Sequence, residues 1–73
     1  MTFYKGTIRT RRESDAKPAE VYTDVWWYYD RVGNVVVIGE ELHDYSSRSA
    51  VKRHFAMSQI AVLTHTERNS NYV

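Results

Sequence analysis

The chain has 73 residues and a net charge of +1, with 42% hydrophobic and 26% charged residues, one Pro, three Gly and no Cys. This composition excludes a disordered tail or linker, and the lack of Cys excludes a disulfide framework or a thiolate metal site. The longest apolar runs, residues 35–38 and 60–63, are too short to span a membrane, and the first residues lack the order of a signal peptide. We therefore expect one small, soluble, cytoplasmic domain over residues 1–73.

Charge is unevenly distributed along the chain. Residues 1–12 carry basic side chains and no acid, whereas residues 24–44 carry five acids against Arg31 alone. A second basic stretch spans residues 48–53. The two basic stretches either converge in the fold or form separate solvated faces, as is ordinary for soluble domains.

The first elements are predicted from residue type. Residues 3–12 favour a strand, because β-branched and aromatic residues are spread along them without a helical period. The segment 12–20 is polar and contains Pro18, which excludes a central strand and indicates a loop.

A β-hairpin is predicted over residues 21–42, with Gly33-Asn34 as a two-residue turn. In that register Tyr29 pairs with Ile38 and Trp27 with Glu40. One face, the predicted core, gathers Val21, Val25, Trp27, Tyr29, Val36, Ile38 and Leu42. The other face gathers Tyr22, Trp26, Tyr28, Val35 and Val37 with Asp24, Asp30 and Glu41. A longer turn that shifted the register by one residue would exchange the two faces of the third strand.

The last element is predicted as a helix from near Arg48 to about Thr64, capped by Ser46 or Ser47. Apolar and small residues recur there at intervals of three and four, at Ala50, Val51, His54, Phe55, Ser58, Ala61 and Val62. Residues 60–66 are rich in β-branched side chains, so a last strand there is the alternative. Residues 67–73 are a polar tail. The predicted fold class is α+β, a three-stranded antiparallel sheet with one C-terminal helix packed on one face (βββα).

The order of features from Trp26 to about Ala61 resembles the repeat of small YegP-like domains. These features are the aromatic strand, the Gly-Asn turn, the valine-rich strand, Gly39-Glu40, and the helix entry from Tyr45 to Ala50. The resemblance covers about half of the chain and implies the same βββα fold, but the family has no known function. This chain departs from the pattern in its single copy, its longer polar loop and its additional acids.

No enzymatic signature is present in the sequence. The chain has no thiol and no Gly-rich phosphate loop, and its Ser, His and Asp residues follow no catalytic order. His43, His54 and His65 are eleven residues apart, too far for the three- or four-residue spacing of a helical metal pair. We expect no catalysis, no metal and no cofactor.

Two functional hypotheses remain. The first is a non-catalytic protein-binding module that also forms a homodimer, for example a bacteriophage or mobile-element accessory protein that docks on a host factor and inhibits or redirects it. Its contact surface is the aromatic and acidic face of the hairpin: Tyr22, Trp26, Tyr28, Val37, Asp24, Asp30 and Glu41. The alternative is a nucleic-acid-binding domain in which basic residues contact phosphates and the sheet aromatics stack on bases. Those basic residues are Lys5, Arg9, Arg11, Arg12, Arg48, Lys52 and Arg53.

Overall fold

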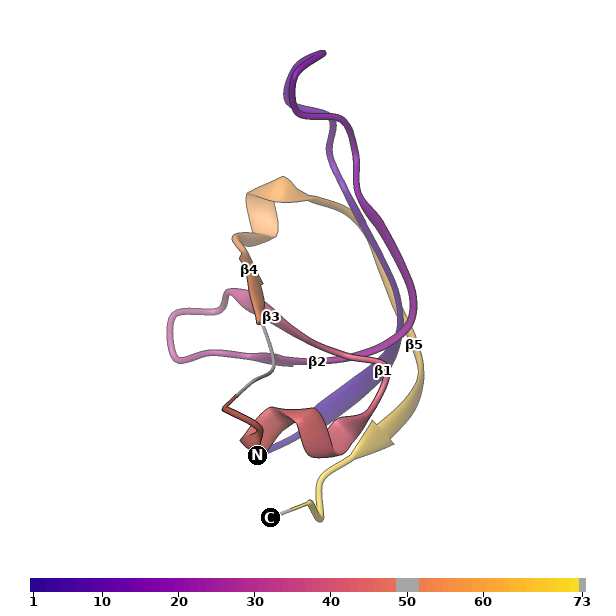
Figure 1. Cartoon of the computed structure of the whole chain (residues 1–73), viewed down its shortest axis with the longest axis vertical. Coiled ribbons are helices and arrows are strands. Elements are labelled where there is room, and N and C mark those ends of the chain that lie inside the picture. Colours follow the sequence, from indigo (N-terminus) through magenta and orange to yellow (C-terminus); the bar gives the residue numbers. More distant parts are fainter. Residues whose placement is uncertain (49–51, 73) are drawn as a thin grey trace.

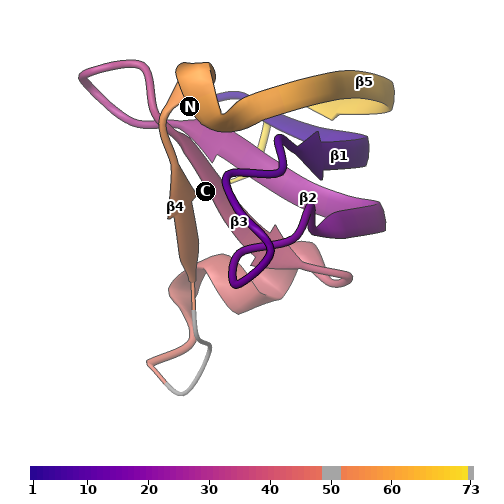
Figure 2. The same cartoon turned by 90° about the horizontal axis from the view of Figure 1, so that it is seen from above.

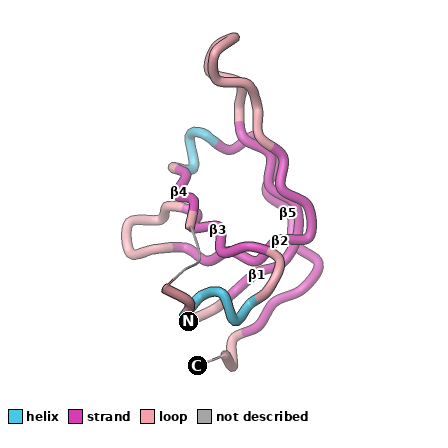
Figure 3. Tube along the Cα trace, viewed as in Figure 1, coloured by secondary structure: helices cyan, strands magenta, loops and turns pink. Residues whose placement is uncertain are grey.

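A computed structural model describes residues 1–48 and 52–72, and in it the chain forms a five-stranded antiparallel sheet in the order β4-β3-β2-β1-β5. The strands are β1 (Phe3–Thr10), β2 (Val21–Tyr29), β3 (Val35–Gly39), β4 (Arg53–Phe55) and β5 (Ile60–Asn69). Two short 3-10 turns, η1 (Leu42–Ser46) and η2 (Met57–Gln59), connect β3 to β4 and β4 to β5 (Figures 1 and 3). Strands β1 to β4 form a meander, and β5 returns to pair with β1.

The predicted α+β fold with a C-terminal helix is wrong. The described part of the predicted helix contains β4, η2 and the start of β5, and no α-helix occurs within residues 1–48 and 52–72. Ala50 and Val51 of the predicted apolar stripe lie outside the described residues. The alternative of a last strand at residues 60–66 is confirmed, and that strand continues to Asn69, so the predicted polar tail begins inside it.

Pairing with β1 explains why the β-branched segment forms a strand. Strand β5 pairs antiparallel along the whole of β1, from Thr10 opposite Ile60 to Phe3 opposite Asn69. This pairing joins positions that are far apart in the sequence. A local helical period at residues 50–62 therefore competes with a long ladder of backbone hydrogen bonds, and tertiary context decides between them.

The hairpin forms, but its predicted register is wrong. The turn comprises residues 30–34, so Tyr29 lies opposite Val35 and Trp27 opposite Val37. This shift exchanges the two faces of β3 relative to the prediction. Val35 and Val37 pack beside Trp27, whereas Val36 lies opposite Tyr28.

A β-bulge in β2 changes the strand's alternation. Between Gly6 opposite Val25 and Ile8 opposite Tyr22, β2 has one residue more than β1, and Asp24 there has a positive φ of 55°. As a result Tyr22 and Val25 both pack on the same hydrophobic cluster, and Val21, predicted in the core, is 61% exposed.

Both faces of the sheet are covered by the chain itself. On one side the buried cluster comprises Ile8, Val25, Trp27, Val35, Val37, Phe55 and Ile60. On the other side the ring of Phe3 contacts Tyr28, Tyr45 and Tyr72 edge-on, with centroids 5.0–5.8 Å apart. Tyr45 comes from η1, which packs beside β3 (Figure 2). A second aromatic face therefore exists, as the sequence indicates, but much of it packs within the chain.

Candidate binding cleft

The predicted aromatic and apolar contact residues do not share one surface. Val37 is 4% exposed and packs in the core, and Tyr22 packs against the same cluster, with its ring 6.0 Å from that of Phe55. Tyr28 is half-buried on the opposite side, in edge contact with Tyr45 at 5.3 Å. Burial is the main cause that raises the pKa of Tyr28 above its ordinary value, with smaller contributions from Tyr45 and Asp30. Trp26 is also half-buried, and Lys5 Nζ lies 5.9 Å from its ring centroid.

The three predicted acidic contact residues lie at three separate places. Asp24 is exposed at the bulge, and Glu41 is exposed just before η1. Asp30 fixes the turn: its Oδ1 accepts hydrogen bonds from the backbone N–H groups of Val32 (3.0 Å) and Asn34 (2.9 Å). These contacts hold the pKa of Asp30 below its ordinary value, with the Asn34 N–H as the largest cause. Asp30 has a structural role in this turn.

The predicted basic residues are also dispersed, and several have partners. Lys5 lies 3.7 Å from Glu67, Arg12 pairs with Asp15, and Lys52 lies 6.0 Å from the ring centroid of Tyr45. Arg48 is exposed in the segment after η1. Arg9, Arg11 and Arg12 do come together around a shallow hollow of about 410 Å³.

A deeper cleft, of about 430 Å³, lies between the 11–20 loop and β4. Its lining comes from two parts of the chain that are distant in sequence: the loop with the end of β1, and the neighbouring elements β4 and η2, which contribute all of β4 and Gln59. The lining residues are Thr10, Arg11, Glu13, Ala16, Lys17, Pro18, Glu20, Arg53, His54, Phe55 and Gln59. The two basic stretches of the sequence meet here through Arg11 and Arg53. We call this site the β4 cleft.

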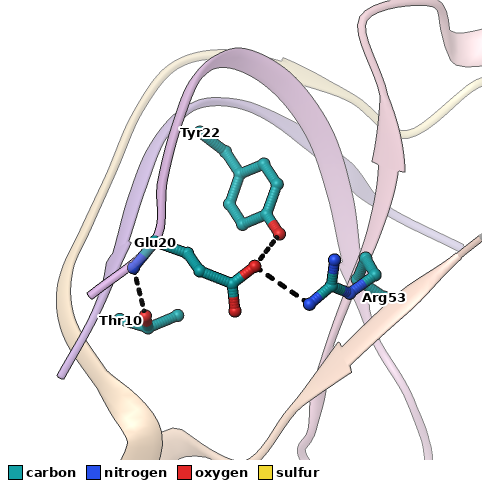
Figure 4. A network of polar contacts seen from close by, with 4 residues as sticks. All are labelled: Thr10, Glu20, Tyr22 and Arg53. Carbon is teal, nitrogen blue, oxygen red and sulfur yellow. Dashed lines mark hydrogen bonds and ion pairs between the residues drawn. The ribbon is translucent and has the colours of Figure 1, made fainter. Parts of the chain in front are cut away.

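Glu20 is at the centre of the polar contacts in the β4 cleft (Figure 4). Its Oε1 accepts hydrogen bonds from the Tyr22 hydroxyl (2.8 Å) and from an Arg53 guanidinium nitrogen (2.9 Å). Its backbone N–H donates to Thr10 Oγ1 (2.8 Å). Burial raises the pKa of Tyr22, and the hydrogen bond to Glu20 adds to that effect. Glu20 thus joins the loop, β2 and β4.

The 11–20 loop is held by backbone hydrogen bonds to β1, to η2 and within itself. Arg11 N–H donates to the Gln59 carbonyl (2.7 Å), Thr10 N–H donates to the Glu20 carbonyl (2.9 Å), and Lys17 N–H donates to the Ser14 carbonyl (3.1 Å). The side-chain Oε1 of Gln59 accepts a hydrogen bond from the Ala56 N–H (2.8 Å). The wall of the cleft that the loop forms is therefore held in place by contacts within the chain.

The chemistry of the β4 cleft suits binding. Its side chains provide two carboxylates, two guanidinium groups, one ammonium group, one imidazole and apolar surface from Ala16 and Pro18. The described residues contain no group of three or more His, Asp or Glu side chains placed to hold a metal ion.

Sequence reasoning missed most of this site. It named Arg11 and Arg53 only as phosphate contacts, and it assigned Glu20 to a loop without a role. The available signal was the polar 12–20 segment with Pro18, because an ordered loop of this length between two strands often carries function.

No family model matches the chain, and neither the curated proteins nor the solved structures yield a match. Within the residues that the structure describes, no helix is long and apolar enough to cross a membrane.

Proposed function

We propose that the chain is a non-catalytic protein-binding module and that the β4 cleft is its binding site. The observation that carries this proposal is a cleft of about 430 Å³ that combines apolar surface with hydrogen-bonding groups held in place. Concave sites of this size with a few fixed polar groups are the usual places where proteins bind ligands. The proposal concerns binding alone, and no observation speaks for a phage origin or for inhibition of a host factor.

The covered faces of the sheet support this location. The second aromatic face, a candidate contact surface in the sequence, has Phe3 1% exposed and Tyr28 packed against Tyr45. The cleft is open at the surface, and most of its lining residues lie in an exposed loop. A partner can reach the cleft without rearrangement of the sheet.

Filling the cleft tests the proposal. Ala16 is exposed in the loop, so Ala16→Trp places a large side chain at the cleft with little expected loss of stability. Val32→Trp, at an exposed position of the turn between β2 and β3 and outside the cleft lining, is the matched control. Affinity capture from a nuclease-treated lysate should retain a protein on the parent chain and on Val32→Trp, but not on Ala16→Trp. A photoreactive amino acid at position 54 should cross-link the same protein. Equal retention on Ala16→Trp would place the contact elsewhere and contradict the proposal.

A nucleic-acid-binding function is the second candidate, and one observation favours it. Arg9, Arg11 and Arg12 surround the shallow hollow of about 410 Å³ together with Thr10, Ala19 and Ala61. Phosphate-dependent binding weakens steeply with salt, because each neutralised phosphate releases counterions. Binding of a single-stranded oligonucleotide should then fall by orders of magnitude as salt rises from about 50 to 200 mM and should be lost in Arg9→Ser/Arg11→Ser/Arg12→Ser. No binding at low salt would reject this candidate.

A further inference from the structure

The β4 cleft extends around the edge of a strand. Successive residues of a β-strand point to opposite faces of the sheet, so a hollow above one face contacts every second residue. All three residues of β4, Arg53, His54 and Phe55, line the β4 cleft. The cleft therefore runs past the edge of β4, where side chains from both faces can reach it.

Among the described residues, no strand pairs with the outer edge of β4. In the sheet β4 is the outermost strand, and within the described part of the chain it pairs only with β3, from Val35 opposite Phe55 to Val37 opposite Arg53. A strand with one neighbour presents backbone N–H and C=O groups on its other side, and an extended peptide can complete their hydrogen bonding.

The opposite wall of the cleft is already fixed. The 11–20 loop is tied to β4 by the ion pair of Glu20 with Arg53 and to η2 by the Arg11 N–H to Gln59 carbonyl bond. A segment that enters the cleft thus meets two ordered walls. Binding to such a site costs less conformational entropy than binding to a mobile loop.

The charge of the lining selects the kind of segment. Three cationic side chains (Arg11, Lys17 and Arg53) and two carboxylates (Glu13 and Glu20) line the cleft, which leaves one net positive charge with His54 neutral. Glu20 is engaged by Arg53 and Glu13 lies 3.9 Å from Lys17. Arg11 has no carboxylate partner among the described residues. The group that remains available is thus a cation.

We infer that the β4 cleft takes an extended, acidic segment of another protein, which adds to the sheet as a strand beside β4 and places a carboxylate near Arg11. This inference rests on the proposed protein-binding function and specifies the kind of partner that binds. Backbone hydrogen bonds to β4 would supply affinity, and the carboxylate would supply selectivity.

The test uses peptides selected for binding to the whole chain. A displayed library of short random peptides is panned against the folded protein, and the enriched peptides are synthesised. We expect them to carry Asp or Glu and to shift the backbone amide signals of residues 53–55 in NMR spectra. Each peptide is then N-methylated at one backbone nitrogen at a time. In strand addition alternate peptide N–H groups face β4, so methylation should abolish binding at every second position and be tolerated at the positions between.

Charge reversal provides the second arm. Arg11→Glu should weaken peptide binding about five- to tenfold, as expected for one exposed ion pair replaced by repulsion. Arg9→Glu is the matched control: Arg9 is an exposed arginine on β1 outside the cleft, and its reversal should leave the affinity within about twofold.

Each outcome decides a different statement. Peptides that shift residues 53–55 but show no alternation on N-methylation would overturn strand addition and leave the protein-binding proposal standing. Equal effects of Arg11→Glu and Arg9→Glu would overturn the acidic preference. Failure to enrich any peptide, or enrichment of peptides that bind away from β4, would overturn the inference itself. The capture experiment with Ala16→Trp judges the proposed function separately.

Discussion

Asp30 fixes the turn between β2 and β3 with two hydrogen bonds to backbone N–H groups. Its pKa is lower in the folded chain than its ordinary value of 3.8. The carboxylate therefore stabilises the fold above pH 3.8, and this contribution is lost as the pH falls below 3.8 through the lowered folded pKa. We expect Asp30→Ala to be less stable than the parent at neutral pH and the difference to disappear in acid. Urea unfolding across pH measures this. Glu41→Ala, at an exposed position just before η1, is the control, and an equal pH dependence for both variants would contradict the role of Asp30.

Gly6 permits the closest approach between β1 and β5. A Cβ at this position would overlap the carbonyl oxygen of Thr64 and lie 2.6 Å from the His65 Cα. Both obstacles are backbone atoms, so they cannot rotate away. Gly6→Ala should destabilise the fold by about 1–3 kcal/mol or more in urea unfolding. Gly33→Ala is the comparison: nothing lies within 4 Å of a Cβ there, but φ is +87°, and the cost should be about 1 kcal/mol. A Gly6→Ala variant as stable as the parent would mean that β5 does not pair with β1 as described.

Trp27 and Trp26 differ in burial, as the alternation of β2 predicts for these two neighbours. Trp27 is 1% exposed, whereas Trp26 is half-buried beside Lys5. Trp27→Ala should cost about 3–5 kcal/mol, most of the stability of a domain this small. Trp26→Ala should cost about 1 kcal/mol, since it loses one partly exposed cation–π contact. Thermal unfolding of the two variants measures both, and a larger loss for Trp26→Ala would reverse the assignment of faces.

The indole N–H of Trp27 has no hydrogen-bond partner within the described part of the chain. A buried donor without an acceptor costs about 1–3 kcal/mol. Trp27→Phe removes that donor and keeps an aromatic ring, so it should be less destabilising than Trp27→Ala by a wide margin.

Among the elements, the first three strands could be predicted from the sequence because their signals are local. β-Branched and aromatic residues mark β1, β2 and β3, and Pro18 marks the loop between the first two. The turn after β2 could not be predicted, because Asp30 lengthens it through side-chain contacts that compete with a Gly-Asn turn. The bulge at Asp24 could not be predicted either, because the residue with positive φ there is not a Gly.

The last third of the chain was mispredicted because its structure depends on distant partners. Strand β5 forms by pairing with β1, and β4 forms by pairing with β3. Neither pairing produces a short-range repeat in the sequence of residues 53–69. The recurrence of apolar residues at intervals of three and four was the stronger pattern there, and it favoured a helix. The β4 cleft lies between these late elements and the loop, so the wall formed by β4 and η2 could not be predicted, although the loop itself was.

The short turn η1 determines how much of the second aromatic face is exposed. Its Tyr45 contacts Phe3 at 5.0 Å and Tyr28 at 5.3 Å between ring centroids. Each such pair contributes about 0.5–1.5 kcal/mol, so Tyr45→Ala should lower stability by about 1–3 kcal/mol. It should also bring the pKa of Tyr28 back toward 10.0, because burial and the neighbouring Tyr45 both raise that pKa. Spectroscopic titration of the tyrosines measures the shift, with His43→Ala in the same turn as the control. An unchanged Tyr28 pKa would mean that η1 does not cover it.

At the scale of the whole molecule, the sheet has two outer strands with different properties. Strand β4 has three residues and borders the cleft, whereas β5 has ten residues and pairs only with β1 among the described strands. Natural proteins protect such edges with charged residues or proline. Residues 60–66 contain neither, and Thr64, His65 and Thr66 are all exposed. Strand β1 and the second aromatic face are occupied within the chain, so we expect the homodimer predicted from the sequence to form through a sheet edge, and β5 is the longer of the two outer strands.

We expect two copies to associate through their β5 edges as antiparallel strands, because the part of the edge without charge or proline, residues 60–66, can complete its hydrogen bonds by pairing with an identical one. Sedimentation velocity over a range of concentrations should show a monomer–dimer equilibrium for the parent chain. Thr64→Lys/Thr66→Lys places like charges along the edge and should shift the equilibrium to monomer. Met57→Lys/Ser58→Lys adds the same charge at exposed positions of η2 and should leave it unchanged. A parent chain that stays monomeric at every concentration would contradict pairing through β5, as would a dimer that persists in the Thr64→Lys/Thr66→Lys variant with its fold intact.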